Sequence, residues 1–299
     1  MSSTSKSLSR RVTRAFRAVL GLPKSLLGAI VVLAPFAIMT AFPGLLAPDD
    51  PYASIGVPLS GPSAAHWFGT DEIGRDVLSR VIYSAHSDVV ISLSATALAF
   101  AVGSLLGIFL GYRGGFVDTA GTRVVDVMLA FPAIVLALFL IAIFGHGELV
   151  EIIAIAAVMM PSMARFARGT SLLLRNRAYI ESSEILFASS AYVIRRHLLP
   201  NAMRSLLVAA SVLAASAVLI SASLSYLGLG VAPPTPSWGT MLYNAFQSVF
   251  QAPLYGVAPG VFITVLAYGY MMLGRGLSDL QGRTGSQERA FRTSAMGRV

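Results

Sequence analysis

The chain has no cysteine and few charged side chains. Without cysteine it can form neither disulfide bonds nor thiolate metal sites. Charged residues make up 12% of the 299 residues, hydrophobic residues make up 55%, and the mean hydropathy is +0.72. A water-soluble domain has about 25% charged residues, so this chain has too little polar surface to cover itself in water. The composition excludes an ordinary soluble protein and indicates a membrane protein.

The sequence patterns of common enzymes are missing too. The histidines, at positions 66, 86, 146 and 197, are dispersed and show no H-E-x-x-H spacing for a metal. The chain has no G-x-S-x-G turn for a nucleophile and no G-x-x-x-x-G-K-[ST] loop for a nucleotide. We therefore expect no catalytic residue and no metal site, and an intramembrane enzyme is a disfavoured interpretation.

Six stretches are long and apolar enough to cross the ~30 Å hydrocarbon core of a bilayer. Because backbone polar groups cannot stay unpaired in lipid, each stretch is predicted to be a helix, with kinks at Pro35, Pro132 and Pro161. The fourth is the least regular, since Glu151 and Pro161 interrupt it. The predicted spans are residues 25–47, 89–112, 124–144, 149–167, 206–229 and 254–273.

Basic residues mark one side of these spans. All of the 22 lysines and arginines except Arg75 and Arg80 fall in four segments, and those two lie in a net-acidic loop. By the positive-inside rule the basic segments are cytoplasmic, so the formal charge of +8 is a topology signal and not a nucleic-acid surface. The basic segments are residues 1–24, 113–123, 165–204 and 275–299.

By the same rule both termini are cytoplasmic. Residues 25–283 are predicted to form one multi-pass membrane domain. Within it, residues 48–88 form an extracytoplasmic loop and residues 168–205 a cytoplasmic loop. Residues 230–253 carry no charge and form a second outer loop. Residues 284–299 are expected to be a disordered cytoplasmic tail.

Residues 1–24 are predicted to be a cytoplasmic tail that includes an interfacial helix. Leu8, Val12 and Phe16 recur at helical spacing with arginines between them, as in an amphipathic helix on the inner leaflet. Arg10 and Arg11 resemble the start of a twin-arginine export signal. The apolar run that follows is too long for a signal peptide and has no convincing cleavage site, so we expect a retained first span.

Small residues dominate two spans. Gly103, Gly107 and Gly111 repeat every four residues and allow close approach of another helix. The fifth span is rich in alanine and serine, which indicates either tight packing or a helix that lines a pathway. The candidate pathway-lining residues are Ser211, Ser216, Ser221 and Ser225.

Few ionisable residues lie within the spans. Asp126 is near the inner end of the third span and Glu151 near the outer end of the fourth, where both can reach the membrane interface. An ion-coupled carrier normally places carboxylates or broken helices near the midplane. Their scarcity disfavours a secondary transporter and indicates that another protein supplies the energy.

The inner loop at residues 181–201, ESSEILFASSAYVIRRHLLPN, is the polar exception in this apolar chain. Residues 179–186 and 191–199 are predicted to be short helices, and Pro200 is expected to stop or kink the second one before the fifth span. A helix held between two spans is a suitable lever for a partner to push. The alternative is a solvated basic loop without a partner.

This loop resembles the EAA loop of ABC importer permeases, whose pattern is roughly E-A-A-x-x-x-G, nine residues, then H-x-L-P-N. Glu181, His197, Leu199, Pro200 and Asn201 match the pattern with the right spacing. The residues that the resemblance assigns to ATPase coupling are Tyr179, Glu181, Ser182, Ser183, Leu186, Phe187, His197, Pro200 and Asn201.

Two outer blocks resemble the same family. Residues 66–80, HWFGTDEIGRDVLSR, resemble its H-P-L-G-T-D-x-x-G-R-D-V-L-S-R block, and residues 225–239 resemble its L-S-F-L-G-L-G and P-P-x-P-S-W-G blocks. The family is the permease (C-type transmembrane) subunit of dipeptide/oligopeptide and nickel ABC importers. The outer-loop motif residues are Gly69, Thr70, Asp71, Gly74, Arg75, Asp76, Pro236, Ser237, Trp238 and Gly239.

The resemblance implies an all-α multi-pass protein of the bacterial plasma (inner) membrane, with six transmembrane helices and the type I ABC importer permease fold. It implies a heterodimer with a homologous permease, two ATPase subunits or a fused ATPase, and an extracytoplasmic substrate-binding protein that docks at the outer loops. The chain itself would hold no cofactor, because the partner ATPases bind ATP and Mg. The substrate would be dipeptides or oligopeptides, with nickel or another small solute as the alternative.

The chain departs from the family pattern at several positions. Ser182 and Ser183 replace two alanines, and Phe187 replaces the glycine that permits a turn. We expect either an altered turn, a more continuous helix, or a role for Phe187 as a hydrophobic knob in the ATPase cleft. Ser221 stands where many relatives carry a glutamate, so a role tied to that carboxylate is expected to be absent. His86 and Asp88 replace an arginine and a serine.

Overall fold

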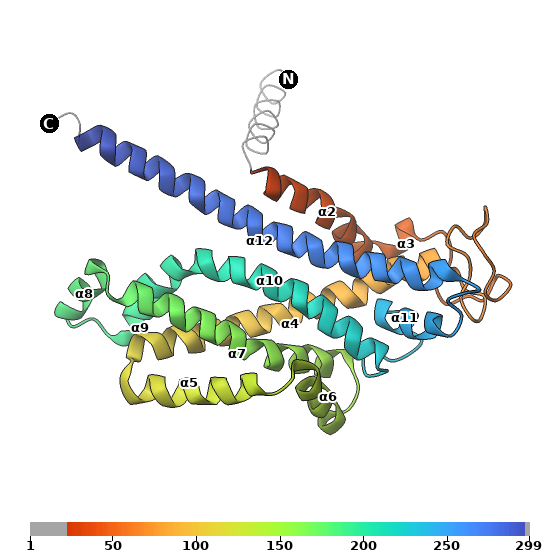
Figure 1. The fold of residues 1–299 in the computed structure, drawn as a ribbon, viewed down its shortest axis with the longest axis horizontal. Helices are drawn as coiled ribbons and strands as arrows, with labels where there is room; N and C mark the ends of the chain where they lie inside the picture. The colour runs from red at the N-terminus through yellow and green to blue at the C-terminus, as the bar shows by residue number, and fades with distance from the viewer. Residues whose placement is uncertain (1–22, 297–299) are drawn as a thin grey trace, which may run out of the picture.

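The computed structural model describes residues 23–296, and their regular elements are all helices (Figure 1). The predicted interfacial helix in residues 1–24 falls almost entirely outside the described residues. An isolated β-bridge joins Thr70 to Asp76. In chain order the helices are α2 (Lys24–Ala41), α3 (Pro43–Leu46), α4 (Val77–Arg113), α5 (Gly115–Ala130), α6 (Ala133–Phe144), α7 (Glu148–Arg175), α8 (Ala178–Ile185), α9 (Ser190–Val193), a π-helical turn (Ile194–Leu198), α10 (Leu199–Tyr226), α11 (Trp238–Phe246) and α12 (Pro253–Met296).

Five continuous helical stretches in the described part are long and apolar enough to cross a membrane, and a sixth span results if α5 and α6 count as one. Those two helices meet at an angle of 91°. We predicted one kinked helix over residues 124–144, so the size of this break corrects the prediction. Phe131 is extended because the ring of Pro132 disfavours helical geometry in the preceding residue. Pro35 and Pro161, in contrast, lie inside continuous helices.

Several helices run beyond their predicted spans. Helix α4 begins at Val77 because the carboxylate of Asp76 caps it, accepting a bond from the backbone N–H of Ser79 at 2.7 Å. Helix α12 runs to Met296, well past the predicted span of residues 254–273, and disorder of the tail over residues 284–299 stays a prediction. Hydropathy marks only the apolar part of a helix, and polar residues extend it into the interface.

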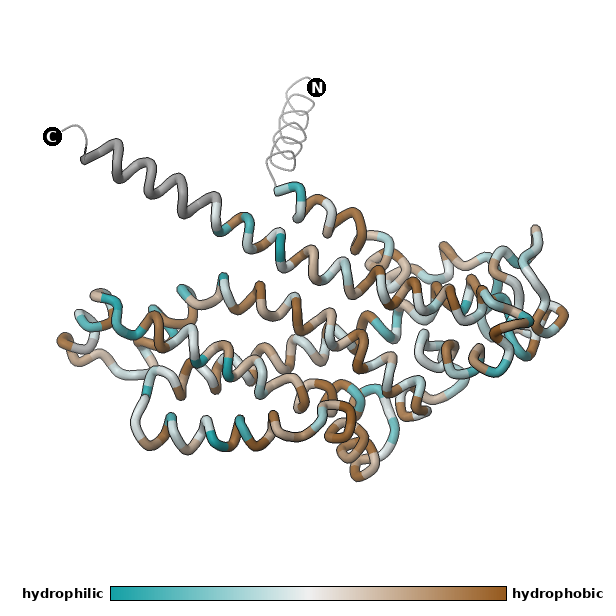
Figure 2. The backbone as a smooth tube through the Cα atoms, in the orientation of Figure 1, coloured by the Kyte–Doolittle hydropathy of each residue, from teal (hydrophilic) through white to brown (hydrophobic). Residues whose placement is uncertain are grey.

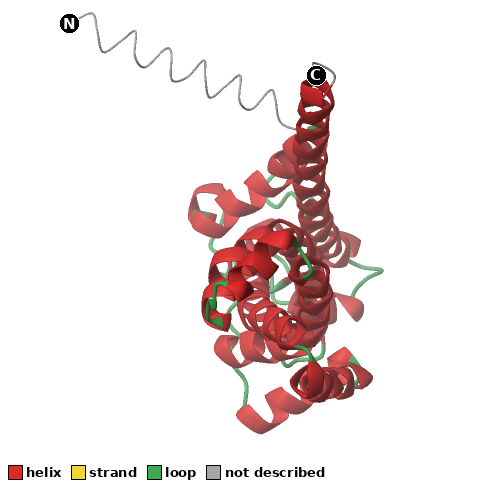
Figure 3. Ribbon diagram, turned by 90° about the vertical axis from the view of Figure 1, so that its left-hand side faces the viewer, coloured by secondary structure: helices red, strands yellow, loops and turns green. Residues whose placement is uncertain are grey.

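The long helices lie side by side, and hydrophobic residues dominate their middle portions (Figure 2). A view from the left-hand end of Figure 1 shows only helices and connecting loops (Figure 3). Helices α4 and α7 pack closest, as the glycine repeat predicts. A Cβ at Gly103 would lie 2.7 Å from the carbonyl oxygen of Met160, and one at Gly111 would lie 2.8 Å from that of Arg168. The glycines therefore allow the two backbones to touch.

The two ends of the bundle differ. Helices α8 and α9 lie at one end, together with the start of α10 and the far end of α12 (Figure 1). This end holds the described parts of the basic segments, and we call it the basic end. Helices α3 and α11 and the loop of residues 47–76 lie at the opposite end, which we call the acidic end.

Candidate functional site

The inner loop forms two short helices that are clamped to the basic end of the bundle. Ile180 of α8, Val193 of α9 and Leu198 of the π-helical turn are fully buried. They belong to one apolar cluster with Ile108 of α4 and Leu206 of α10, among others. Since buried apolar contacts are close-packed and incompressible, a force on the loop is transmitted to the long helices.

Helix α8 carries the start of the family pattern. Glu181 is exposed, so its carboxylate is free to contact another protein. The hydroxyls of Ser182 and Ser183 donate to the carbonyl oxygens of Ala178 and Tyr179, both at 2.8 Å. These bonds within the helix satisfy both hydroxyls, so the two serines replace alanines without exposing an unpaired group.

Phe187 makes the turn between the two short helices. Its φ is +57°, the left-handed conformation that glycine normally supplies at this position. The N–H of Ala188 donates to the carbonyl oxygen of Ser183 at 3.0 Å, which is the closing bond of a Schellman motif. The turn therefore keeps the glycine geometry with a non-glycine residue, at a cost of about 1–2 kcal/mol. Of the alternatives from the sequence, the altered turn and the more continuous helix are both wrong, and the role of Phe187 as a hydrophobic knob stays a prediction.

The tip of this loop is apolar and exposed. Phe187 is 96% exposed, and its neighbours Ile185 and Leu186 are 75% and 80% exposed. The arginines at positions 177, 195 and 196 of the same loop are exposed too. Three consecutive large apolar residues facing outward are typical of a protein–protein contact, where burial of such side chains stabilises the complex.

His197 connects the two halves of the loop. Its ring centroid lies 6.0 Å from that of Tyr179 in α8 and 5.8 Å from that of Tyr192 in α9. Its carbonyl oxygen accepts a bond from the side-chain amide of Asn201 at 2.6 Å. His197 is thus linked to α8, α9 and the first turn of α10.

Pro200 does not stop the helix, which rules out one of the two outcomes that we predicted, a stop or a kink. It lies in the first turn of α10, where its missing N–H is tolerated, and the chain is helical without a break from Ser190 to Tyr226. The distortion appears just before it, in the π-helical turn Ile194–Leu198. The second half of the loop is therefore a direct extension of the fifth span.

The first outer motif is a buried cap and not an exposed surface. Thr70, Asp71 and Asp76 are buried, and Gly69 and Gly74 have positive φ values of 78° and 83°. The side chain of Thr70 donates to the carbonyl oxygen of Val57 at 2.5 Å. Both glycines turn the chain where a side chain would strain the backbone.

Ion pairs hold this cap together. Asp71 accepts from the side chain of Arg75 at 2.6 Å and lies 3.3 Å from Arg80. The carboxylate of Glu72 accepts a bond from the side-chain amide of Asn244 at 3.0 Å and another from the hydroxyl of Tyr255. The cap therefore ties the loop to α4, α11 and α12.

The second outer motif begins α11. Pro236 precedes Ser237, whose hydroxyl caps the helix by accepting from the N–H of Thr240 at 3.3 Å. Trp238 is fully buried, and its backbone N–H donates to Asp88 at 2.9 Å. Gly239 fits closely against α10, where a Cβ would lie 2.5 Å from that of Ser225.

Asp88 is a structural residue that sequence reasoning missed. We noted it only as a departure from the family, yet it joins α4 to the start of α11 through Trp238. Its partner lies 150 residues away in the chain, so no local pattern predicts the bond.

The candidate pathway serines divide into two groups. Ser211, Ser221 and Ser225 are buried within the bundle, while Ser216 is partly exposed. Burial of the first three supports the interpretation of tight packing for those positions. Of these four serines, only Ser216 is accessible from outside the bundle.

Glu151 is buried, contrary to our expectation that it reaches the interface. It is 1% exposed, and its Oε1 accepts from the hydroxyl of Ser221 at 2.7 Å. Its Oε2 is buried and has no hydrogen-bond partner. Helix α7 thus brings a carboxyl group to the position on α10 where the resemblance led us to expect none. Asp126, at the other end, is partly exposed and pairs with Arg165 at 2.6 Å.

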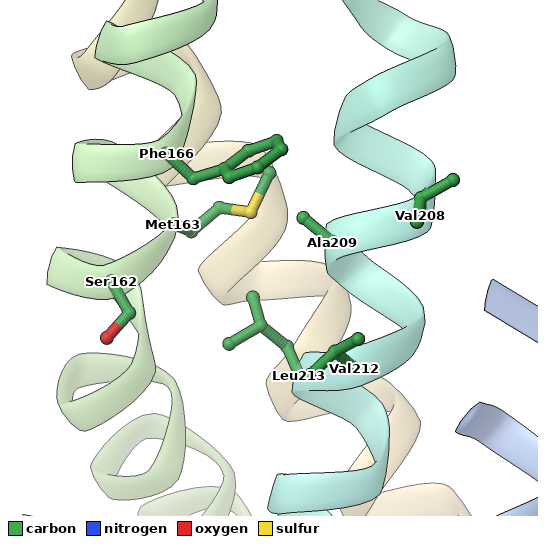
Figure 4. A pocket seen from close by; sticks show the side chains of 7 residues that line it. All are labelled: Ser162, Met163, Phe166, Val208, Ala209, Val212 and Leu213. Atoms are coloured by element: carbon green, nitrogen blue, oxygen red, sulfur yellow. The ribbon is translucent and has the colours of Figure 1, made fainter. Parts of the chain in front are cut away.

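A pocket of about 360 Å³ lies between α7 and α10 (Figure 4). Met163 and Phe166 project from α7 toward Ala209 and Leu213 of α10. The lining offers no charged group to a polar solute. The lining residues are Ser162, Met163, Phe166, Val208, Ala209, Val212 and Leu213.

The chain matches the family model described as "binding-protein-dependent transport system inner membrane component" over residues 103–277. It is similar to the probable D,D-dipeptide transport system permease protein DdpC of Escherichia coli (strain K12), with 36% identity over 260 residues and 87% of each chain covered. The dipeptide transport system permease protein DppC of Alkalihalophilus pseudofirmus is 35% identical over 252 residues, which are 84% of this chain and 83% of that protein.

A third relative is the glutathione transport system permease protein GsiD of Escherichia coli O1:K1 / APEC, 40% identical over 222 residues, which cover 74% of this chain and 73% of that protein. Among solved structures, an inward-facing conformation of the MetNI methionine ABC transporter gives a TM-score of 0.57 at 21% identity. It covers 68% of this chain and 95% of that one. At this identity the likeness shows the fold.

Proposed function

The chain belongs to the family of binding-protein-dependent transport system inner membrane components, and from this membership we propose that it forms half of the pathway by which an ATP-driven importer takes up short peptides. It is a multi-pass inner-membrane protein and the permease subunit of an ABC importer. It is not an ATPase, and ATP binds to the partner subunits.

In the proposed assembly, a homologous permease completes the pathway and two ATPase subunits, or one fused ATPase, dock at the basic end. Both termini then lie in the cytoplasm. A substrate-binding protein docks at the acidic end, where Val57, Trp67 and Ile73 are exposed apolar residues of the first outer loop. Their exposure supports a docking role for the surface around the buried cap.

The observation that carries the coupling role is that one loop has both a buried face, which packs on the long helices, and an exposed apolar tip. Ile180 and Leu198 are buried against the long helices, while Leu186 and Phe187 project outward. Because the second half of the loop continues into α10 without a break, displacement of the tip by an ATPase tilts that helix. We propose that this movement alternates the pathway between its outward and inward states.

Among the other residues of the coupling pattern, Glu181 and Asn201 differ in role. Glu181 is exposed and would contact the ATPase directly. Asn201 bonds to the carbonyl group of His197 and would hold the π-helical turn in place. Tyr179 and His197 would hold α8 against the π-helical turn through their ring contact.

Short peptides are the proposed substrates because two of the relatives are described as dipeptide permeases. Glutathione is the second candidate, since the GsiD relative is 40% identical. Nickel remains an alternative from the sequence alone.

The test is uptake by the complete transporter in proteoliposomes with ATP inside and the binding protein and the labelled solute outside. Radiolabelled dialanine, radiolabelled glutathione and ⁶³Ni²⁺ are measured in parallel. We expect ATP-dependent movement of dialanine or glutathione and none of nickel. Uptake that persists with ADP in place of ATP contradicts the proposal, and uptake of nickel alone corrects the substrate.

A further inference from the structure

The turn between α8 and α9 carries a phenylalanine, Phe187, in a backbone conformation that favours glycine and at a position exposed to water. Among the described residues, only Leu59 and Phe187 are non-glycine residues with positive φ. Glycine or asparagine adopts this conformation at less cost than phenylalanine. The ring of Phe187 is also almost fully exposed to water, so it gains nothing from the rest of the chain. Both disadvantages remain unless the ring is covered by something outside this chain.

We propose that Phe187 is an aromatic anchor that enters an apolar cleft of the ATPase subunit. The inference rests on the proposed function, because it requires an ATPase partner at the basic end. The left-handed turn places the ring at the apex of the loop, where α8 ends. Ile185 and Leu186 precede it and widen the apolar contact.

The charge of the loop indicates what kind of partner surface would fit it. Arg177, Arg195 and Arg196 are exposed on the same loop, and residues 175–201 contain four arginines against two glutamates. A cleft with an apolar floor and an acidic rim is complementary to this surface. An aromatic residue with neighbouring arginines is the composition that dominates the binding energy of protein interfaces.

The first measurement is the affinity of the purified permease assembly for its ATPase subunit, in nanodiscs. Phe187→Gly and Phe187→Asn accept the left-handed turn but lack the ring, whereas Phe187→Tyr keeps the ring. We expect about 10- to 100-fold weaker binding for the first two variants and little change for the third. Phe250 is the matched control, because it is a 99% exposed phenylalanine at the acidic end. Phe250→Gly is expected to leave ATPase affinity unchanged.

The second measurement separates an anchor from a structural residue. In the permease without ATPase, Phe187→Gly removes backbone strain, so the melting temperature is expected to be equal or higher. Weaker ATPase binding together with a lower melting temperature overturns the proposal, since the residue then acts by holding the turn. Wild-type affinity in Phe187→Gly also overturns it.

The third measurement tests the inner leaflet as a competing partner for the ring. The fluorescence of Phe187→Trp is compared with that of the wild-type chain, which has Trp67 and Trp238. Without ATPase, the added indole of Phe187→Trp is expected to emit as an indole in water. When ATPase is added, its emission is expected to shift to shorter wavelength because the ring enters an apolar cleft. A blue-shifted signal in nanodiscs without ATPase overturns the proposal in favour of lipid. If the wild-type permease binds no ATPase, the proposed function itself fails.

Discussion

The hydroxyl of Ser221 on α10 donates to the carboxyl oxygen Oε1 of Glu151 on α7 at 2.7 Å, inside the helix bundle. The two residues are 70 positions apart in the chain, and both are 1% exposed. The bond joins the span that follows the coupling loop to the span that precedes it. It is therefore placed to keep the two helices together when the loop moves.

Removal of this bond is expected to weaken the bundle. Ser221→Ala leaves both oxygens of Glu151 without a partner, so the free energy of unfolding should fall by about 1–2 kcal/mol. The measurement is unfolding of the purified chain in mixed micelles. Ser223→Ala is the control, because that hydroxyl bonds only to its own helix at Leu219 and its loss should cost less than about 0.5 kcal/mol.

The double variant Ser221→Ala with Glu151→Leu completes the cycle. It removes both polar partners, so most of the lost stability should return. The stability of the double variant is compared with that of Ser221→Ala and of Glu151→Leu. If the loss in the double variant equals the sum of the two single losses, the hydrogen bond has no energetic role.

Close packing of α4 on α7 is expected to depend on the glycine repeat. Gly107→Ala places a Cβ 2.8 Å from that of Ala167, which forces the helices apart and should cost about 1–3 kcal/mol. Gly169→Ala is the matched control on α7, where a Cβ meets nothing within 4 Å. There the unfolding free energy should be unchanged or raised by up to about 1 kcal/mol. Equal effects at both glycines would contradict the packing argument.

The outer cap is expected to depend on Asp71. Asp71→Ala leaves the buried guanidinium group of Arg80 and the partly buried one of Arg75 without this partner, so stability should fall by about 3 kcal/mol or more. Limited proteolysis of the loop before α4 should report the change as faster cleavage. Asp50→Ala removes an exposed carboxylate from the same loop and should leave the cleavage rate unchanged. If Asp71→Ala is cleaved as slowly as Asp50→Ala and the wild-type chain, the ion pairs do not hold the cap.

The six apolar segments, the clustering of basic residues and the glycine repeat could be predicted because hydropathy, charge and helical period are local properties of a sequence. The 91° break between α5 and α6 was underestimated, since a proline shows where a helix bends but not by how much. The bond between Asp88 and Trp238 and the burial of Glu151 depend on residues that meet only in the folded chain.

The coupling loop was the most predictable part of the candidate site, because its pattern lies within residues 179–201. For the backbone at Phe187 we expected an altered turn or a more continuous helix, and both are wrong, because the structure shows the left-handed turn that glycine normally makes. The pathway serines were the least predictable, since a small residue suits a packed interface and an open path equally well.

The central claim is that the loop at residues 181–201 transmits ATP hydrolysis to the pathway, and its most direct test is peptide uptake per ATP hydrolysed in proteoliposomes. Glu181→Lys and His197→Glu are compared with Asp279→Lys, a charge reversal of an exposed residue on α12 outside the loop. The account predicts about a tenfold or larger loss of ATP-driven uptake for both loop variants and a normal rate for the control. Normal uptake per ATP in both loop variants would contradict it.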